Sequence, residues 1–68
     1  MIIDLVTDKD INWMRYESNI APKVGETIST LNPTKNTFEV LSVDHLVRPE
    51  SFSDDMKQQL ITVTVREI

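Results

Sequence analysis

Apolar residues alternate with polar residues along most of this chain, at the period of two that half-buried β-strands show. The clearest run is residues 60–68, LITVTVREI, in which Ile61, Val63 and Val65 share one face and threonines occupy the other. Because successive side chains of a strand point to opposite faces, this run matches a sheet covered on one side. We therefore predict a half-buried strand at this end of the chain.

The first third of the chain predicts two more strands. Residues 1–7, MIIDLVT, place Ile3 and Leu5 on one side of an extended segment. Residues 8–12 are rich in Asp and Asn and predict a turn, because these side chains bond their own backbone. Residues 13–18, WMRYES, alternate again and predict a short second strand, with a helical turn as the alternative.

The only glycine of the chain, Gly25, follows Pro22 and precedes another alternating run. Glycine adopts positive φ without a steric clash of a Cβ atom, and proline suits a turn or the entry to a strand. A phosphate-binding loop would need several glycines and a Lys-Ser/Thr pair, which this segment lacks. Residues 22–25 are therefore predicted to turn the chain into a strand over residues 26–31.

The longest strand is predicted at residues 37–47, TFEVLSVDHLV, after a turn marked by Asn32 and Pro33. Apolar residues occupy both of its faces, with Val40 on one and Leu41 on the other. Such a strand is either partly buried on two sides or changes faces at a bulge or bend. Long bent strands of this kind close small barrels.

These elements predict one domain that spans residues 1–68. Its fold class is mainly β, a small antiparallel barrel of four or five strands, SH3-like or OB-like, with at most one short helical turn. That turn would begin at Ser53, within the acidic segment 48–59 that otherwise forms a loop.

Size and composition limit how such a domain is stabilised. A chain of 68 residues buries only about 60% of its unfolded surface. Cysteine is absent and histidine occurs once, so a disulfide, a thiolate zinc site and a His-rich metal site are excluded. We expect no metal and no cofactor, and we expect a homo-oligomer because small domains gain stability from a partner chain.

The charge balance bears on partners and location. Lys and Arg number 7 against 11 Asp and Glu, for a formal net charge of −4. This balance disfavours nucleic acid, whose binding proteins use positive charge to displace counterions. The N-terminus lacks the basic start of a secretory signal, and no apolar run approaches the roughly 20 residues of a membrane span. We expect a cytoplasmic protein that does not bind membranes.

Residues 13–16 combine two aromatic side chains with a cation. Aromatic and Arg side chains are enriched at the energetic centres of protein interfaces, and Met offers adaptable apolar surface. Strict alternation places Trp13 on the same strand face as Arg15. As an alternative to partner binding, Trp13 or Met14 would cap the open end of a barrel. The candidate partner-binding residues are Trp13, Met14, Arg15, Tyr16, Phe52 and Met56.

His45 and Arg48 are the candidate ligand-binding residues. The single imidazole offers a contact that changes charge near neutral pH, and the alternative is a hydrogen-bonded His at the end of the sheet. In a strand Asp44 points to the opposite face from His45, so no Ser-His-Asp triad is predicted. The acids at positions 4, 8 and 10 lack the spacing of a calcium loop. We expect no catalytic residue.

Two segments resemble a known group of proteins. PKVGETI, residues 22–28, followed by FEVLSVDH, residues 38–45, is similar to short proteins of bacterial and phage genomes with small SH3-like barrels. The resemblance implies a compact barrel-like fold and a mobile-element origin, and it implies no catalytic residue. The matching positions are Pro22, Val24, Gly25, Glu26, Phe38, Val40, Val43 and His45.

Two functions of different classes are consistent with these features. The first is a non-enzymatic interaction protein, a phage-encoded accessory protein or an inhibitor of a host system, that docks on a protein partner. The alternative is a small-ligand protein, in which a pocket between subunits binds or sequesters a nucleotide-like anion. The charges for that pocket would come from Arg15, Lys23, Lys35 and Arg48, with Trp13 or Tyr16 stacking on the ligand.

Overall fold

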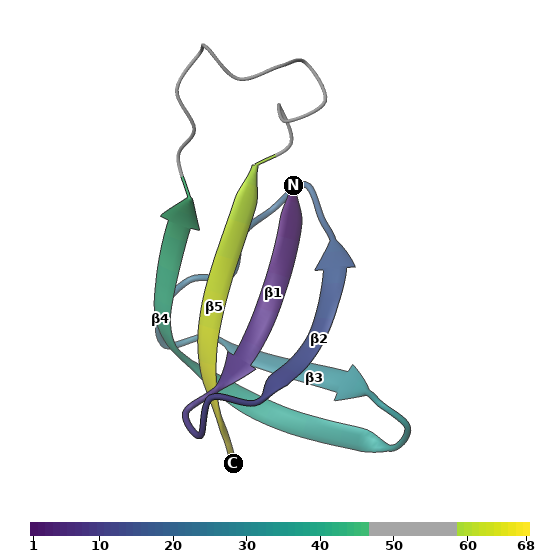
Figure 1. Cartoon of the computed structure of the whole chain (residues 1–68). Coiled ribbons are helices and arrows are strands. Elements are labelled where there is room, and N and C mark those ends of the chain that lie inside the picture. The colour runs from purple at the N-terminus through teal and green to yellow at the C-terminus, as the bar shows by residue number, and fades with distance from the viewer. Residues whose placement is uncertain (47–58) are drawn as a thin grey trace, which may run out of the picture.

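The chain folds into one curled sheet of five strands (Figure 1). The computed structural model describes residues 1–46 and 59–68, and within these ranges no helix is long and apolar enough to cross a membrane. The predicted mainly β, barrel-like fold is confirmed, whereas the helical turn expected at Ser53 lies outside the described residues. The strands are β1 (Ile2–Thr7), β2 (Asn12–Glu17), β3 (Thr27–Leu31), β4 (Lys35–Leu46) and β5 (Leu60–Glu67).

The strands lie in the order β2-β1-β5-β4-β3. The β1–β2, β4–β5 and β3–β4 pairs are antiparallel, as expected, but β1 and β5 run parallel, with Ile3 beside Ile61 and Leu5 beside Val63. This parallel pair departs from the antiparallel barrel that the sequence favoured. Its two strands are joined only through the other three, so no short connection reveals their direction.

The core consists of apolar side chains from the three central strands, all on the concave face of the sheet. β1, β4 and β5 supply every one of these buried residues, as the period-two patterns predict. β2 and β3, the two edge strands, contribute partly buried residues that pack against this core. The buried apolar residues are Ile3, Leu5, Phe38, Val40, Ile61, Val63 and Val65.

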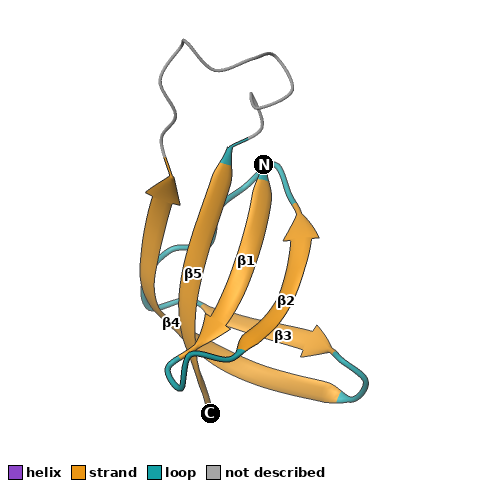
Figure 2. Ribbon diagram, viewed as in Figure 1, coloured by secondary structure: helices purple, strands orange, loops and turns teal. Residues whose placement is uncertain are grey.

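A bulge in β4 bends the sheet into a half-barrel (Figure 2). Val40 pairs with Val65 and Ser42 with Thr64, so Leu41 is an extra residue in the ladder. The bulge lets Val40 before it and Val43 after it both pack on the core. Of the two alternatives predicted for this strand, the structure shows the change of faces at a bulge. The bulge swings the first half of β4 with β3 away from the rest of the sheet.

A second bulge turns Trp13 toward the core. Met14 pairs with Leu5 and Asn12 pairs with Val6, which leaves Trp13 as the extra residue of β2. Trp13 and Met14 therefore both pack against the buried cluster. The expectation that Trp13 shares the face of Arg15 is wrong, because strict alternation fails at a bulge.

Gly25 forms the corner that leads into β3, as predicted. The backbone N–H of Glu26 donates to the carbonyl of Lys23 at 3.1 Å, and Gly25 at the third position of this turn has φ 91°. A positive φ at that position is the mark of a type II turn. The N–H of Gly25 and the carbonyl of Glu26 then both bond Val40, at 3.0 and 2.9 Å, which joins the turn directly to β4.

We expect Gly25→Ala to destabilise the fold by about 1 kcal/mol, because an L-residue pays that much to hold a left-handed conformation. Apart from Gly25 and its two chain neighbours, no described residue has an atom within 4 Å of the position that a Cβ would take, so crowding does not contribute. Urea unfolding measures the loss. Gly25→Asn is the matched variant and should lose less, since Asn tolerates positive φ. An alanine variant as stable as the wild type would contradict this account of the turn.

Candidate functional site: a groove between the two edge strands

The two edges of the sheet, β2 and β3, approach each other without pairing. Side chains connect them instead. The indole N–H of Trp13 donates to the Thr30 hydroxyl at 2.9 Å, and the side-chain amide of Asn32 donates to the Trp13 carbonyl at 3.2 Å. Thr30 is only 6% exposed, so the first of these hydrogen bonds is shielded from water. We call Trp13, Thr30 and Asn32 the edge clasp.

The indole ring also packs on the core. Its centroid lies 5.2 Å from that of Phe38, with the ring planes inclined by 64°. This edge-to-face geometry is favourable for aromatic pairs beyond the area they bury. Because Phe38 belongs to β4, Trp13 connects β2 both to β3 and to the opposite wall of the half-barrel.

Beyond the edge clasp the two edges separate and leave an open groove of about 430 Å³, which we call the β2–β3 groove. Most of its lining is apolar, and buried Leu5 forms part of it. Leu31 on its rim is 80% exposed and extends the apolar lining to the surface. The lining residues are Leu5, Met14, Tyr16, Ile28, Ser29, Thr30 and Leu31.

The backbone of β3 presents hydrogen-bonding groups along the edge that faces away from β4. The N–H of Val40 donates to the Glu26 carbonyl, and this bond sets the phase of the antiparallel ladder. In such a ladder alternate residues direct both backbone groups to the partner strand. The N–H and C=O groups of Thr27, Ser29 and Leu31 therefore point away from β4, toward the unpaired edge.

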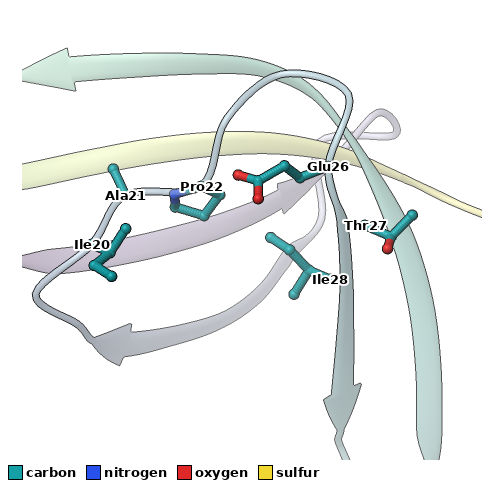
Figure 3. A pocket seen from close by; sticks show the side chains of 6 residues that line it. All are labelled: Ile20, Ala21, Pro22, Glu26, Thr27 and Ile28. Carbon is teal, nitrogen blue, oxygen red and sulfur yellow. The ribbon is translucent and has the colours of Figure 1, made fainter.

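A shallower hollow of about 200 Å³ extends this surface beside the start of β3 (Figure 3). Ile20 and Pro22, from the connection after β2, face Ile28 across it, and the Glu26 carboxylate lies at its border. That carboxylate accepts a hydrogen bond from the backbone N–H of Lys23 at 2.6 Å. Ile28 lines both the hollow and the β2–β3 groove, so apolar surface continues from one to the other.

The structure divides the candidate partner-binding residues. Met14 and Tyr16 line the β2–β3 groove, and burial raises the pKa of the Tyr16 phenol above its ordinary value. Arg15 instead lies on the convex face, where its guanidinium binds Asp4 through two hydrogen bonds of 2.6 and 3.0 Å. Phe52 and Met56 lie outside the described residues.

Of the two candidate ligand-binding residues only His45 is described, and it does not line the groove. His45 is exposed near the end of β4, where its Nδ1 lies 3.3 Å from the side-chain nitrogen of Gln59. This contact matches the alternative of a hydrogen-bonded His at the end of the sheet. Arg48 lies outside the described residues. Within the described part of the chain, no group of three or more His, Cys, Asp or Glu residues could hold a metal ion.

Sequence reasoning missed the β3 half of the groove. Thr30 and Asn32 were read only as strand and turn formers, although both bond Trp13. The alternation of TISTL, residues 27–31, does place Ile28 and Thr30 on one face. This pattern indicates that the two side chains lie on the same side of β3. The partner across the gap is 17 residues away from Thr30, which no local pattern reveals.

A scan against protein-family models, a search of curated proteins and a search of solved structures each found no match to this chain.

The Asp4–Arg15 pair predicts a dependence of stability on acid. The hydrogen bond from Arg15 lowers the pKa of the Asp4 carboxyl in the folded state below its ordinary value of 3.8. The stabilisation is therefore present above that value and is lost as the pH falls through the lowered one. We expect the wild type to exceed Asp4→Asn in urea midpoint at about pH 6, with the difference fading near pH 3.

Arg15→Gln is the matched variant for this experiment, because it removes the same pair from the other side. Its urea midpoint should depend on pH as weakly as that of Asp4→Asn. Equal losses for all three proteins on acidification would show that the pair contributes nothing to the pH dependence.

Proposed function

We propose that this chain is a non-enzymatic interaction protein that binds a protein partner in the β2–β3 groove. The single observation that supports this proposal is the open edge of the sheet, where Leu5 of the core and apolar side chains beside it line an open groove. Exposed contiguous apolar surface on a small domain is typical of a protein interaction site. Met14 and Tyr16 add the adaptable and aromatic side chains that such sites favour.

The occupant we propose is an extended segment of another protein that adds to the β3 edge. Backbone groups of Thr27, Ser29 and Leu31 point toward that edge, and main-chain hydrogen bonds to them would supply affinity without a particular partner sequence. Apolar side chains of the added segment would enter the groove. β3 carries no charged residue, whereas charges on an edge strand oppose such pairing.

The biological setting belongs to the same proposal. A domain of 68 residues with a protein-binding edge suits a phage-encoded accessory protein, or an inhibitor that occupies a surface of a host protein in the cytoplasm. Self-association is the companion hypothesis, since Ile20, Leu31 and Ile68 each expose more than half of their surface. Covering them with a second copy would remove this apolar area from water.

The alternative of a nucleotide-like anion site gains no comparable support. Arg15 is paired with Asp4 on the convex face, Lys23 belongs to the turn before β3, and Lys35 begins β4. These described cations lie on different elements, and none of them lines the β2–β3 groove, the hollow beside it or the other pockets of the described residues. We therefore advance only the protein-binding function.

Leu31→Asp tests this function with little risk to folding, because Leu31 is 80% exposed. We expect it to weaken partner capture from a bacterial lysate by about tenfold or more, since an uncompensated charge would be buried against the partner. Val24→Asp is the matched control, because Val24 is 65% exposed and lies outside the groove. Quantitative affinity capture with both variants and the wild type measures the effect.

Light scattering on the same three proteins shows whether the occupant is a second copy of the chain. Capture that Leu31→Asp and Val24→Asp reduce equally, or that neither reduces, would exclude the β2–β3 groove as the binding surface. Capture of a protein by the wild type supports the proposal only if Leu31→Asp reduces it more than Val24→Asp does.

A further inference from the structure

A second and smaller pocket lies at the turn between β1 and β2, where Trp13 also forms part of the lining. Its volume is about 170 Å³. Phe38 lies behind Trp13, and Ile11 adds an aliphatic wall. Two acids, Asp8 and Glu67, complete the border together with one base, Lys9. We call this space the turn pocket.

The backbone of the turn is held in place by several hydrogen bonds. The Thr7 hydroxyl accepts from the backbone N–H groups of Lys9 and Ile11, at 3.3 and 3.2 Å. The N–H of Asp8 donates to the carbonyl of Val65 at 2.8 Å, which fastens the turn to β5. Asp10 takes a positive φ of 62°, a conformation that Asp tolerates. The position of the Asp8 backbone beside the pocket is therefore fixed before any ligand arrives.

The second acid is oriented by a neighbour. A carboxylate oxygen of Glu67 accepts a hydrogen bond from the side-chain amide of Asn36 at 2.8 Å. Neither Asp8 nor Lys9 forms an ion pair with another described residue. The pocket border therefore holds two carboxylates against one ammonium, a formal charge of −1 that favours a cation.

The aromatic part of the pocket favours the same kind of ligand. Trp13 lines the pocket, and its indole N–H already donates to Thr30, so this side chain has no hydrogen-bond donor left for a ligand. A cation near the face of an indole is attracted by the ring quadrupole, and Trp is the best side chain for this interaction. An anion would meet both the ring and the excess carboxylate with unfavourable electrostatics.

We propose that the turn pocket binds an alkylammonium group, held between the Trp13 ring and the carboxylates of Asp8 and Glu67. The apolar carbons of the ligand pack on Ile11, and its ammonium group lies toward the acids. A lysine side chain of a protein and a free small amine share this chemistry. The inference does not rest on the β2–β3 groove, because the two pockets share no lining residue and the turn pocket needs no partner chain.

Fluorescence of the purified chain tests the proposal directly, because Trp13 is the only tryptophan. Titration with butylammonium at constant ionic strength should shift the emission in a saturable manner, and butanol, its neutral analogue, should not. A blocked peptide with one lysine, titrated alongside, distinguishes the sources. Tighter binding of the peptide indicates a protein lysine, and equal or weaker binding indicates a free amine.

Substitutions of the acids and of the base in the turn pocket should change the affinity for butylammonium in opposite directions. A control outside the pocket separates binding at this site from a general effect of net charge. Asp8→Asn and Glu67→Gln should each weaken butylammonium binding about fivefold, the value of one unit charge at 4 Å in water. Lys9→Gln should tighten binding, because it removes the like charge. Asp44→Asn, which changes the net charge equally but lies on β4 outside the pocket, should leave the affinity unchanged.

Three results would overturn the proposal: no saturable shift with butylammonium, an equal shift with butanol, or an equal change of affinity in Asp44→Asn and the two pocket variants. Circular dichroism of each variant checks that it is folded. Glu67→Gln keeps an oxygen acceptor for Asn36, so it remains informative even where Asp8→Asn disturbs the turn.

Discussion

One side chain, Trp13, holds together the two edges of an open sheet. β2 has a single strand partner, β1, and β3 has a single strand partner, β4, so backbone pairing leaves the half-barrel with two free edges. The indole joins them by a shielded hydrogen bond to Thr30 and by its contact with Phe38. Thr30, its hydrogen-bond partner, lines the β2–β3 groove, and the indole itself lines the turn pocket, so both pockets border this contact.

The incomplete closure has a physical origin in the two bulges. The bulge at Leu41 bends β4 so that its first half carries β3 across the end of the sheet, and the bulge at Trp13 turns the indole inward to meet it. β2 and β3 meet at a wide angle (Figure 2), and strands at such an angle cannot form a continuous ladder. Side chains therefore close the contact at Trp13 and Thr30, and a groove opens beside it. The two edges differ in how well they resist pairing with a strand of another chain. β2 includes Arg15, which is paired with Asp4, whereas β3 has no charged residue.

Much of the fold could be predicted from the sequence, because burial imposes a period of two on strands. The buried sets of β1 and β5 and the corner at Gly25 follow from local residue order, whereas for β4 that order left a bulge and burial on two sides as alternatives. The direction of β1 beside β5 could not be predicted, since it depends on contacts between the two ends of the chain. The candidate site was half predicted: Trp13, Met14 and Tyr16 were identified from their chemistry, whereas Thr30 and Leu31 became visible only through the approach of the edges.

A double-mutant cycle across the edge clasp tests this account most directly. Trp13→Phe keeps an aromatic ring but removes the N–H donor, and Thr30→Val removes the acceptor with little change of shape. If the hydrogen bond joins the two edges, each single variant should lose stability in urea and the double variant should lose less than the sum, with a coupling of about 1 kcal/mol. Strictly additive losses would mean that the two residues act independently and that the half-barrel is not held closed at Trp13.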